Sequence, residues 1–174
     1  MTKRVLILAA DGFEQSELMD PKKALEDAGF ETVVVSIEAG SIKGWKDKNW
    51  GDSVRVDATL DDVSADDFDA LLLPGGQMNP DILRMNDDAI DLINDFDDAG
   101  KIIAAICHAP WLMAEADILD GRTVTSWPSI RTDLANAGAD VVDEEVVVDG
   151  NFITSRMPDD IPAFSKALID ALSE

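Results

Sequence analysis

The chain has 174 residues and a formal net charge of −22, because only 14 Lys and Arg accompany 36 Asp and Glu. This length predicts one domain over residues 1–174 with a single buried core. The chain lacks the basic patches of nucleic-acid-binding proteins, and anionic membrane surfaces would repel it. No apolar run reaches the roughly 20 residues of a membrane helix, and no signal peptide is recognisable, so we expect a cytoplasmic protein.

The acidic residues are scattered among core-forming segments, in pairs such as Asp61-Asp62, Asp87-Asp88 and Asp159-Asp160. Self-repulsion of this size destabilises a compact state unless salt screens it. The composition therefore indicates adaptation to a high-salt cytoplasm or, more simply, an acidic mesophilic protein.

In chain order, the first half of the sequence alternates predicted strands with a helix. Gly29 is expected to end the helix, and Pro21 either starts or kinks it. The expected elements are a buried strand over 4–10, a helix over 17–28, a valine-rich strand over 31–37, a loop over 40–51 and a short buried strand over 70–73.

The second half continues the alternation. Asp149-Gly150 predicts the turn of a β-hairpin. The expected elements are a helix over 87–98, a buried strand over 101–106, a helix over 109–115, hairpin strands over 141–148 and 151–155, and a helix over 161–172. Alternating strands and helices indicate a mostly parallel sheet covered on both faces.

Three predicted strands end in residues that can carry chemistry. Asp11-Gly12-Phe13-Glu14 follows the first strand, Gly75-Gly76 follows the strand over 70–73, and Cys107-His108 follows the strand over 101–106. In open α/β sheets, ligands bind beyond the carboxyl ends of the strands. We therefore expect the functional site at this edge.

Cys107 is the only cysteine, and it lies where a buried strand turns into a helix. This placement resembles a nucleophile elbow, and a helix N-terminus lowers a thiol pKa. The alternative is a buried, inert cysteine. A single cysteine excludes a disulfide within the chain, and together with a single histidine it excludes a zinc site of several Cys and His ligands. No dinucleotide or P-loop motif is present, so neither a cofactor nor a metal is expected.

His108 is the only histidine, so any imidazole base must be this one, unless it is simply packed beside the turn. A protonated Glu14 could hydrogen-bond the thiolate, and Glu17 is the competing candidate; either could instead be a surface carboxylate. The backbone N–H groups of Gly76 and His108 could form an oxyanion hole.

These residues resemble the ThiJ/PfpI superfamily, and specifically its PfpI-like intracellular protease and stress-protein branch. The resemblance covers almost the whole chain. Its motifs are Asp11-Gly12-Phe13-Glu14 with Glu17-Leu18, Leu73-Pro74-Gly75-Gly76, Ala105-Ile106-Cys107-His108-Ala109-Pro110, Thr125-Ser126-Trp127-Pro128, the segment 146–151, and Thr154-Ser155-Arg156 with Pro158.

The resemblance implies a flavodoxin-like three-layer sandwich, a homodimer or higher oligomer, and no cofactor. It implies that Cys107 is the nucleophile, that Glu14 hydrogen-bonds it, and that Gly76 and His108 supply oxyanion N–H groups. It also implies that Asp81, from a neighbouring subunit, orients His108. The glutamine amidotransferases share this fold but use a downstream histidine, which this chain lacks.

The leading functional hypothesis is a stress-related enzyme in which Cys107 adds to a carbonyl. The substrate would be a small 2-oxoaldehyde, as for a cofactor-independent glyoxalase, a glycated protein, as for a deglycase, or a peptide, as for a hydrolase. The alternatives are an oxidative-stress sensor that oxidises Cys107 and a chaperone that does not need it.

Overall fold

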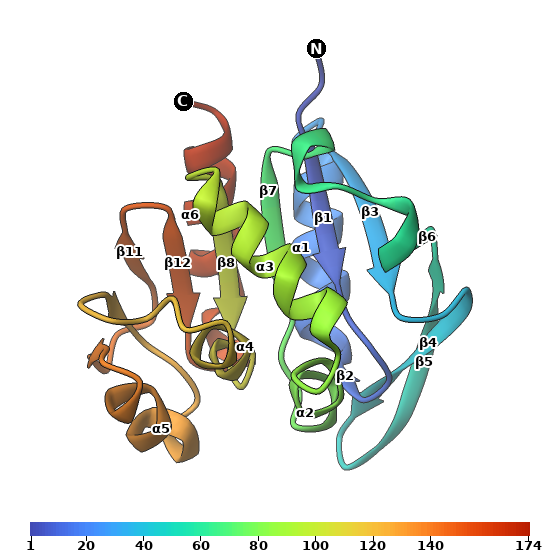
Figure 1. Cartoon of the computed structure of the whole chain (residues 1–174). Helices are drawn as coiled ribbons and strands as arrows, with labels where there is room; N and C mark the ends of the chain where they lie inside the picture. The colour runs from blue at the N-terminus through green and yellow to red at the C-terminus, as the bar shows by residue number, and fades with distance from the viewer.

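The computed structural model describes residues 1–174, and a seven-stranded sheet forms its centre (Figure 1). The strands lie in the order β11-β12-β8-β7-β1-β3-β6, and only β11 runs antiparallel to its neighbour. Their bounds are β1 (Arg4–Leu8), β3 (Glu31–Ser36), β6 (Ala58–Thr59), β7 (Ala70–Leu73), β8 (Ile102–Ile106), β11 (Val147–Asp149) and β12 (Phe152–Ser155). The succession β3-β1-β7-β8-β12 is the flavodoxin-like strand order.

Helices cover both faces of this sheet, which confirms the predicted three-layer architecture. In Figure 1, α3 crosses the near face, while α1 and α6 lie behind the sheet. The helices are α1 (Gln15–Asp27), α2 (Met78–Leu83), α3 (Asp87–Asp98), α4 (Pro110–Glu115), α5 (Arg131–Asn136) and α6 (Ile161–Leu172). Short 3₁₀ turns occupy Leu60–Asp62, Ala65–Asp67, Pro128–Ile130 and Pro158–Asp160.

The alternation of side chains along the strands divides the core in two. On β1, Leu6 and Leu8 pack with α3 and α4, whereas Val5 and Ile7 pack with α1 and α6. All four side chains are fully buried. A strand buried on both faces is a continuous apolar run, which explains why β1, β7 and β8 were predicted close to their observed bounds.

A β-hairpin replaces the loop predicted over 40–51. The strands β4 (Gly40–Lys46) and β5 (Asn49–Val56) pair antiparallel, and β2 (Phe13–Glu14) joins them. The loop prediction is wrong because the turn residues Asp47 and Lys48 both have positive φ, 51° and 64°, without the Asn-Gly or Asp-Gly pair typical of such turns.

The remaining element predictions differ mainly in their bounds. Pro21 lies inside α1 and does not start it, and α6 has the bounds that were predicted. The first strand of the C-terminal hairpin is shorter than predicted, and its first residue, Val141, belongs to β10 (Asp140–Val141), which pairs with β9 (Thr123–Val124). No helix is both long and apolar enough to cross a membrane.

Candidate active site

The loops that follow β1, β7 and β8 meet at one edge of the sheet. The backbone N–H of Glu14 donates to the Gly75 carbonyl at 3.2 Å. The fully buried Asn79 side chain accepts from the Ala10 N–H at 2.7 Å and donates to the carbonyls of Pro74 and Gly75 at 2.8 and 3.1 Å. Buried polar groups that are satisfied in this way fix the relative position of two loops.

Cys107 lies between the end of β8 and the start of α4, in the left-handed region with φ 66°. Few residues other than glycine adopt this conformation, which persists only where surrounding contacts hold it. Here the Cys107 N–H donates to the Ser155 carbonyl at 3.0 Å, and the Cys107 carbonyl accepts from the Trp127 N–H at 2.9 Å. Two backbone hydrogen bonds therefore hold Cys107 in the segment that links β8 to α4.

The His108 ring reaches back to the thiol. Its Nδ1 lies 3.2 Å from Cys107 Sγ, so the two consecutive side chains point toward each other. Burial lowers the pKa of His108. A neutral imidazole in this position can accept the thiol proton at Nδ1.

Glu17, rather than Glu14, is the carboxyl beside the thiol. Glu17 is fully buried, and neither carboxyl oxygen makes a hydrogen bond of standard geometry. A Cβ added to Gly75 would collide with Glu17 Oε1 and come within 2.7 Å of Cys107 Cβ, so the carboxyl lies against Gly75 on the side of Cys107. Burial raises the pKa of Glu17 to about 8, with the charge of Glu14 adding to the rise, and contacts with Cys107 and the backbone of Gly75 and Gly76 oppose it. Glu17 is therefore protonated near neutral pH.

Glu14 lies at the mouth of the same hollow, half-buried, where burial and the charge of Asp47 raise its pKa. Its side chain makes no hydrogen bond to Cys107. The hydrogen bond expected between Glu14 and the thiol is therefore absent from this structure, and Glu17, the competing candidate, lies beside the sulfur. The reason is helical geometry: Glu14 precedes the first turn of α1, whereas Glu17 lies on the face of α1 that packs against the sheet.

Burial raises the pKa of the Cys107 thiol, and the Glu17 charge acts in the same direction. The N–H groups of Gly76 and His108 act in the opposite direction. The lowered thiol pKa predicted from the helix N-terminus is therefore wrong. The helix α4 has only six residues and begins three positions after Cys107, so burial of a thiol that is 6% exposed outweighs its dipole.

The backbone N–H groups of Gly76 and His108 lie near the sulfur and donate to no backbone carbonyl. Gly76 has φ 87°, and a Cβ at this position would come within 2.6 Å of the Glu14 backbone nitrogen. Glycine is therefore required for the close approach of the two loops. Both N–H groups are therefore free to donate to an atom bound beside the sulfur.

Asp81 does not join this group within one chain. It is exposed on α2 and makes neither a hydrogen bond nor an ion pair. Two indoles border His108 instead: Trp111 edge-on at 5.2 Å and Trp127 stacked at 5.9 Å between ring centroids.

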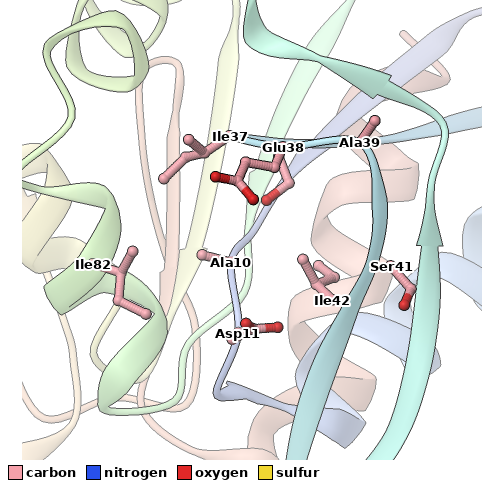
Figure 2. Close-up of a pocket in the computed structure, with 9 residues that line it drawn as sticks. Ala10, Asp11, Ile37, Glu38, Ala39, Ser41, Ile42 and Ile82 are labelled. Carbon is pink, nitrogen blue, oxygen red and sulfur yellow. The ribbon is translucent and has the colours of Figure 1, made fainter.

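A hollow of about 290 Å³ opens over Cys107, with Glu14, Trp45 and Trp127 among its lining residues. Figure 2 shows a different hollow of about 240 Å³ near the ends of β1 and β3. Asp11 and Glu38 are its only ionisable residues, and it shares no residue with the first. The hollow without a thiol or an imidazole cannot perform the chemistry expected of Cys107, so we assign the candidate active site to the Cys107 hollow.

The family model described as the DJ-1/PfpI family matches residues 3–171. The chain belongs to the DJ-1/PfpI family. It is 46% identical to general stress protein 18 of Bacillus subtilis over the full length of both chains. It is 43% identical to a deglycase of Pyrococcus abyssi, over 97% of this chain and 99% of that one, and 42% identical to protein/nucleic acid deglycase 2 of Escherichia coli, over 99% of each.

Solved DJ-1/PfpI structures have the same fold. The DJ-1beta of Drosophila melanogaster superposes with a TM-score of 0.91 at 32% identity, covering 99% of this chain and 91% of that one. A two-domain protein of Anabaena variabilis with a DJ-1/ThiJ/PfpI-like domain superposes with a TM-score of 0.94 at 39% identity, covering 99% of this chain and 48% of that one.

Glu17 could have been singled out in this DJ-1/PfpI chain from spacing alone. It lies at i, i+4 and i+8 with Pro21 and Leu25, which form the buried face of α1. A glutamate on an apolar helix face is either misplaced or functional, because a buried carboxyl is costly without a purpose. The contacts of Asn79 have no comparable sequence pattern, since they are made to the backbone of Pro74 and Gly75 in the preceding turn and to the backbone of Ala10, which is distant in the chain.

Proposed function

We propose that this protein is a stress-related, cysteine-dependent enzyme of the PfpI type in which Cys107 attacks a carbonyl carbon. The observation that carries the proposal is the convergence of a thiol, an imidazole nitrogen 3.2 Å from it and a buried carboxyl at one strand end. The names of the relatives, a general stress protein and two deglycases, support the same class of activity.

The chemistry begins at the thiol. As Sγ forms a bond to the carbonyl carbon, the thiol proton passes to His108 Nδ1 and the carbonyl π pair moves to the oxygen. The N–H groups of Gly76 and His108 would stabilise this oxyanion. No resting thiolate is needed, which suits a thiol whose pKa is raised by burial.

Glu17 would act as a neutral hydrogen-bond donor. Its raised pKa keeps a proton on the carboxyl, and that proton can stabilise negative charge on the sulfur during attack and departure. On a peptide bond the protonated His108 would then give its proton to the leaving amine, and water would release the acyl group and restore the thiol. On a carbinolamine adduct the C–N bond would break as the hydroxyl proton passes to nitrogen, leaving an aldehyde carbonyl that Cys107 attacks. Transfer of the C1 proton to C2 would turn the resulting hemithioacetal into a thioester, which water cleaves to a 2-hydroxy acid and the free thiol.

The favoured substrate is a glycated side chain, that is, the adduct of an amine or guanidine with a 2-oxoaldehyde. The test is release of the free side chain from methylglyoxal-treated N-acetylarginine and N-acetyllysine, beside free methylglyoxal and an unmodified peptide. We expect turnover of the adducts at rates above those of the peptide. Oxidation of Cys107 to a sulfinate by peroxide, with no turnover of any of these compounds, would overturn the proposal.

The family resemblance also supports a cytoplasmic homodimer or higher oligomer in which Asp81 of a second copy approaches His108. Sedimentation equilibrium tests the assembly. An Asp81→Asn variant whose turnover equals that of the parent in a proven dimer would contradict a role for Asp81 across the interface.

The acidic surface supports a high-salt environment. With 36 acids against 14 basic residues, ion pairs such as Lys23–Asp27 and Lys166–Asp170 leave most acids without a cationic partner. We expect the melting temperature to rise by roughly 10 °C or more between dilute buffer and molar KCl, because salt screens the repulsion. Equal melting temperatures at both salt concentrations would contradict this prediction.

A further inference from the structure

The imidazole of His108 is bordered by two aromatic side chains of its own chain. Trp111, on α4, meets it edge-on at 5.2 Å with an interplanar angle of 63°. Trp127, in the loop before the Pro128–Ile130 turn, stacks on it at 5.9 Å with an angle of 21°. Aromatic contacts of this kind restrict the rotation of a ring. Rotation would break the Nδ1 contact with Cys107, so the two indoles protect the geometry of the pair.

The orientation of the Trp111 indole is fixed by residues outside the Cys107 hollow. Its only donor, Nε1–H, points to Asp133 Oδ2 on α5 at 2.9 Å. The guanidinium of Arg84 lies over the indole ring, 5.4 Å from its centroid. A single directional hydrogen bond to a carboxylate is among the stronger ones and selects one rotamer of the indole.

We propose that Asp133 is a positioning residue for His108 and acts through Trp111. The inference rests on the proposed function, because it gives His108 the part of proton acceptor. Asp133 does not touch the reacting atoms; Cys107, Glu17 and Glu14 are the ionisable groups that share the hollow with His108. The arrangement holds the imidazole from within one chain and is independent of any carboxylate from a second copy.

Two substitutions at position 133 test whether the hydrogen bond to Trp111 is what matters. Asparagine removes the charge but keeps an acceptor, and alanine removes the acceptor as well. Asp133→Asn keeps an oxygen that accepts from Nε1–H, so we expect kcat within about threefold of the parent. Asp133→Ala removes the acceptor, and we expect kcat to fall about tenfold to a hundredfold with little change in KM, since small misplacements of a catalytic group have effects of this size. Asn136→Ala, an exposed position on the same helix without a hydrogen bond, is the matched control.

Trp111→Phe tests the route. Phenylalanine keeps an aromatic ring beside His108 but has no N–H, so Asp133→Ala should have no further effect on kcat in that background. Independent, additive losses would overturn the inference, as would an equal loss in Asp133→Asn and Asp133→Ala.

A measurement without substrate separates this inference from the proposed function. His108 is the only histidine, so its ring nitrogens give the only imidazole ¹⁵N resonances of the protein. We expect Asp133→Ala, but not Asp133→Asn or Asn136→Ala, to change the Nδ1 and Nε2 shifts that report the tautomer and the sulfur contact. Unchanged shifts in all three would overturn the positioning role even if Cys107 proved catalytic, whereas a changed spectrum in a protein without turnover would sustain the role and refute the proposed function.

Discussion

Replacing Cys107 by alanine is expected to lower kcat/KM for a methylglyoxal-arginine adduct by about 10⁴-fold or more. Removal of a nucleophile leaves only the contribution of binding and oxyanion stabilisation, and losses of this order are typical. Cys107→Ser should be almost as inactive, because a hydroxyl with a higher pKa gives up its proton to His108 less readily. Steady-state release of the free side chain measures both variants.

The fold should tolerate these changes, which makes the experiment decisive. Cys107 is held by backbone hydrogen bonds to Ser155 and Trp127, and neither depends on the side chain. A melting temperature within a few degrees of the parent is the required control. Retained turnover of the adduct in a folded Cys107→Ala protein would refute the nucleophilic role.

Glu17→Gln is expected to lower turnover by about a hundredfold or more while making the protein more stable at alkaline pH. Glutamine has nearly the shape of glutamate, but its amide is a weaker donor to a developing sulfur charge than a carboxylic acid. It also cannot ionise, so it removes the cost of a buried negative charge beside Cys107. Activity and stability therefore change in opposite directions.

The pH dependence of this stability difference follows from the raised pKa of Glu17. In the unfolded chain this carboxyl has its ordinary pKa of 4.5, and in the folded protein about 8. The folded state thus binds the proton more tightly, and Glu17 lowers the stability of the parent as pH rises from about 4.5 to about 8. The free energy of unfolding, measured with denaturant, should depend on pH equally in the parent and in Glu17→Gln below about pH 4.5. Between about pH 4.5 and about pH 8 the variant should become progressively more stable than the parent, by on the order of 5 kcal/mol at the upper limit.

Glu14→Gln provides the comparison that decides between the two glutamates. Glu14 is half-buried, lines the same hollow three residues before Glu17, and makes no hydrogen bond to the thiol. We expect its substitution to reduce turnover by less than about tenfold and to give no comparable pH-dependent gain in stability. A larger loss for Glu14→Gln than for Glu17→Gln would show that the sequence resemblance had placed the acid correctly.

Segments with one strong periodic pattern could be predicted from the sequence. The apolar runs of β1, β7 and β8 and the helical spacing of α3 and α6 specify their own structure, because burial favours only one conformation for each. The convergence of Cys107, His108 and Gly76 also followed from the sequence, since each lies just after a predicted parallel strand.

The features that were missed depend on contacts between distant segments. The Asp47-Lys48 turn lacks typical hairpin residues, and its strands are stabilised by pairing with the segment after β1. The thiol pKa was predicted from a helix N-terminus, but its direction is set by burial beneath loops that come from three parts of the chain. The contact of His108 with Cys107 depends on the left-handed φ of Cys107. The identity of a residue such as cysteine does not predict that conformation.

The adjacency of Cys107 and His108 along the backbone has a consequence for motion. In enzymes whose nucleophile and proton acceptor come from separate segments, relative motion of those segments lengthens the hydrogen bond between the two groups. Here a single peptide unit links them, so the 3.2 Å approach depends on a few neighbouring torsions. Trp45 of the β4–β5 hairpin lines the same hollow, so a shift of this hairpin would change the shape of the hollow without separating the sulfur from the imidazole.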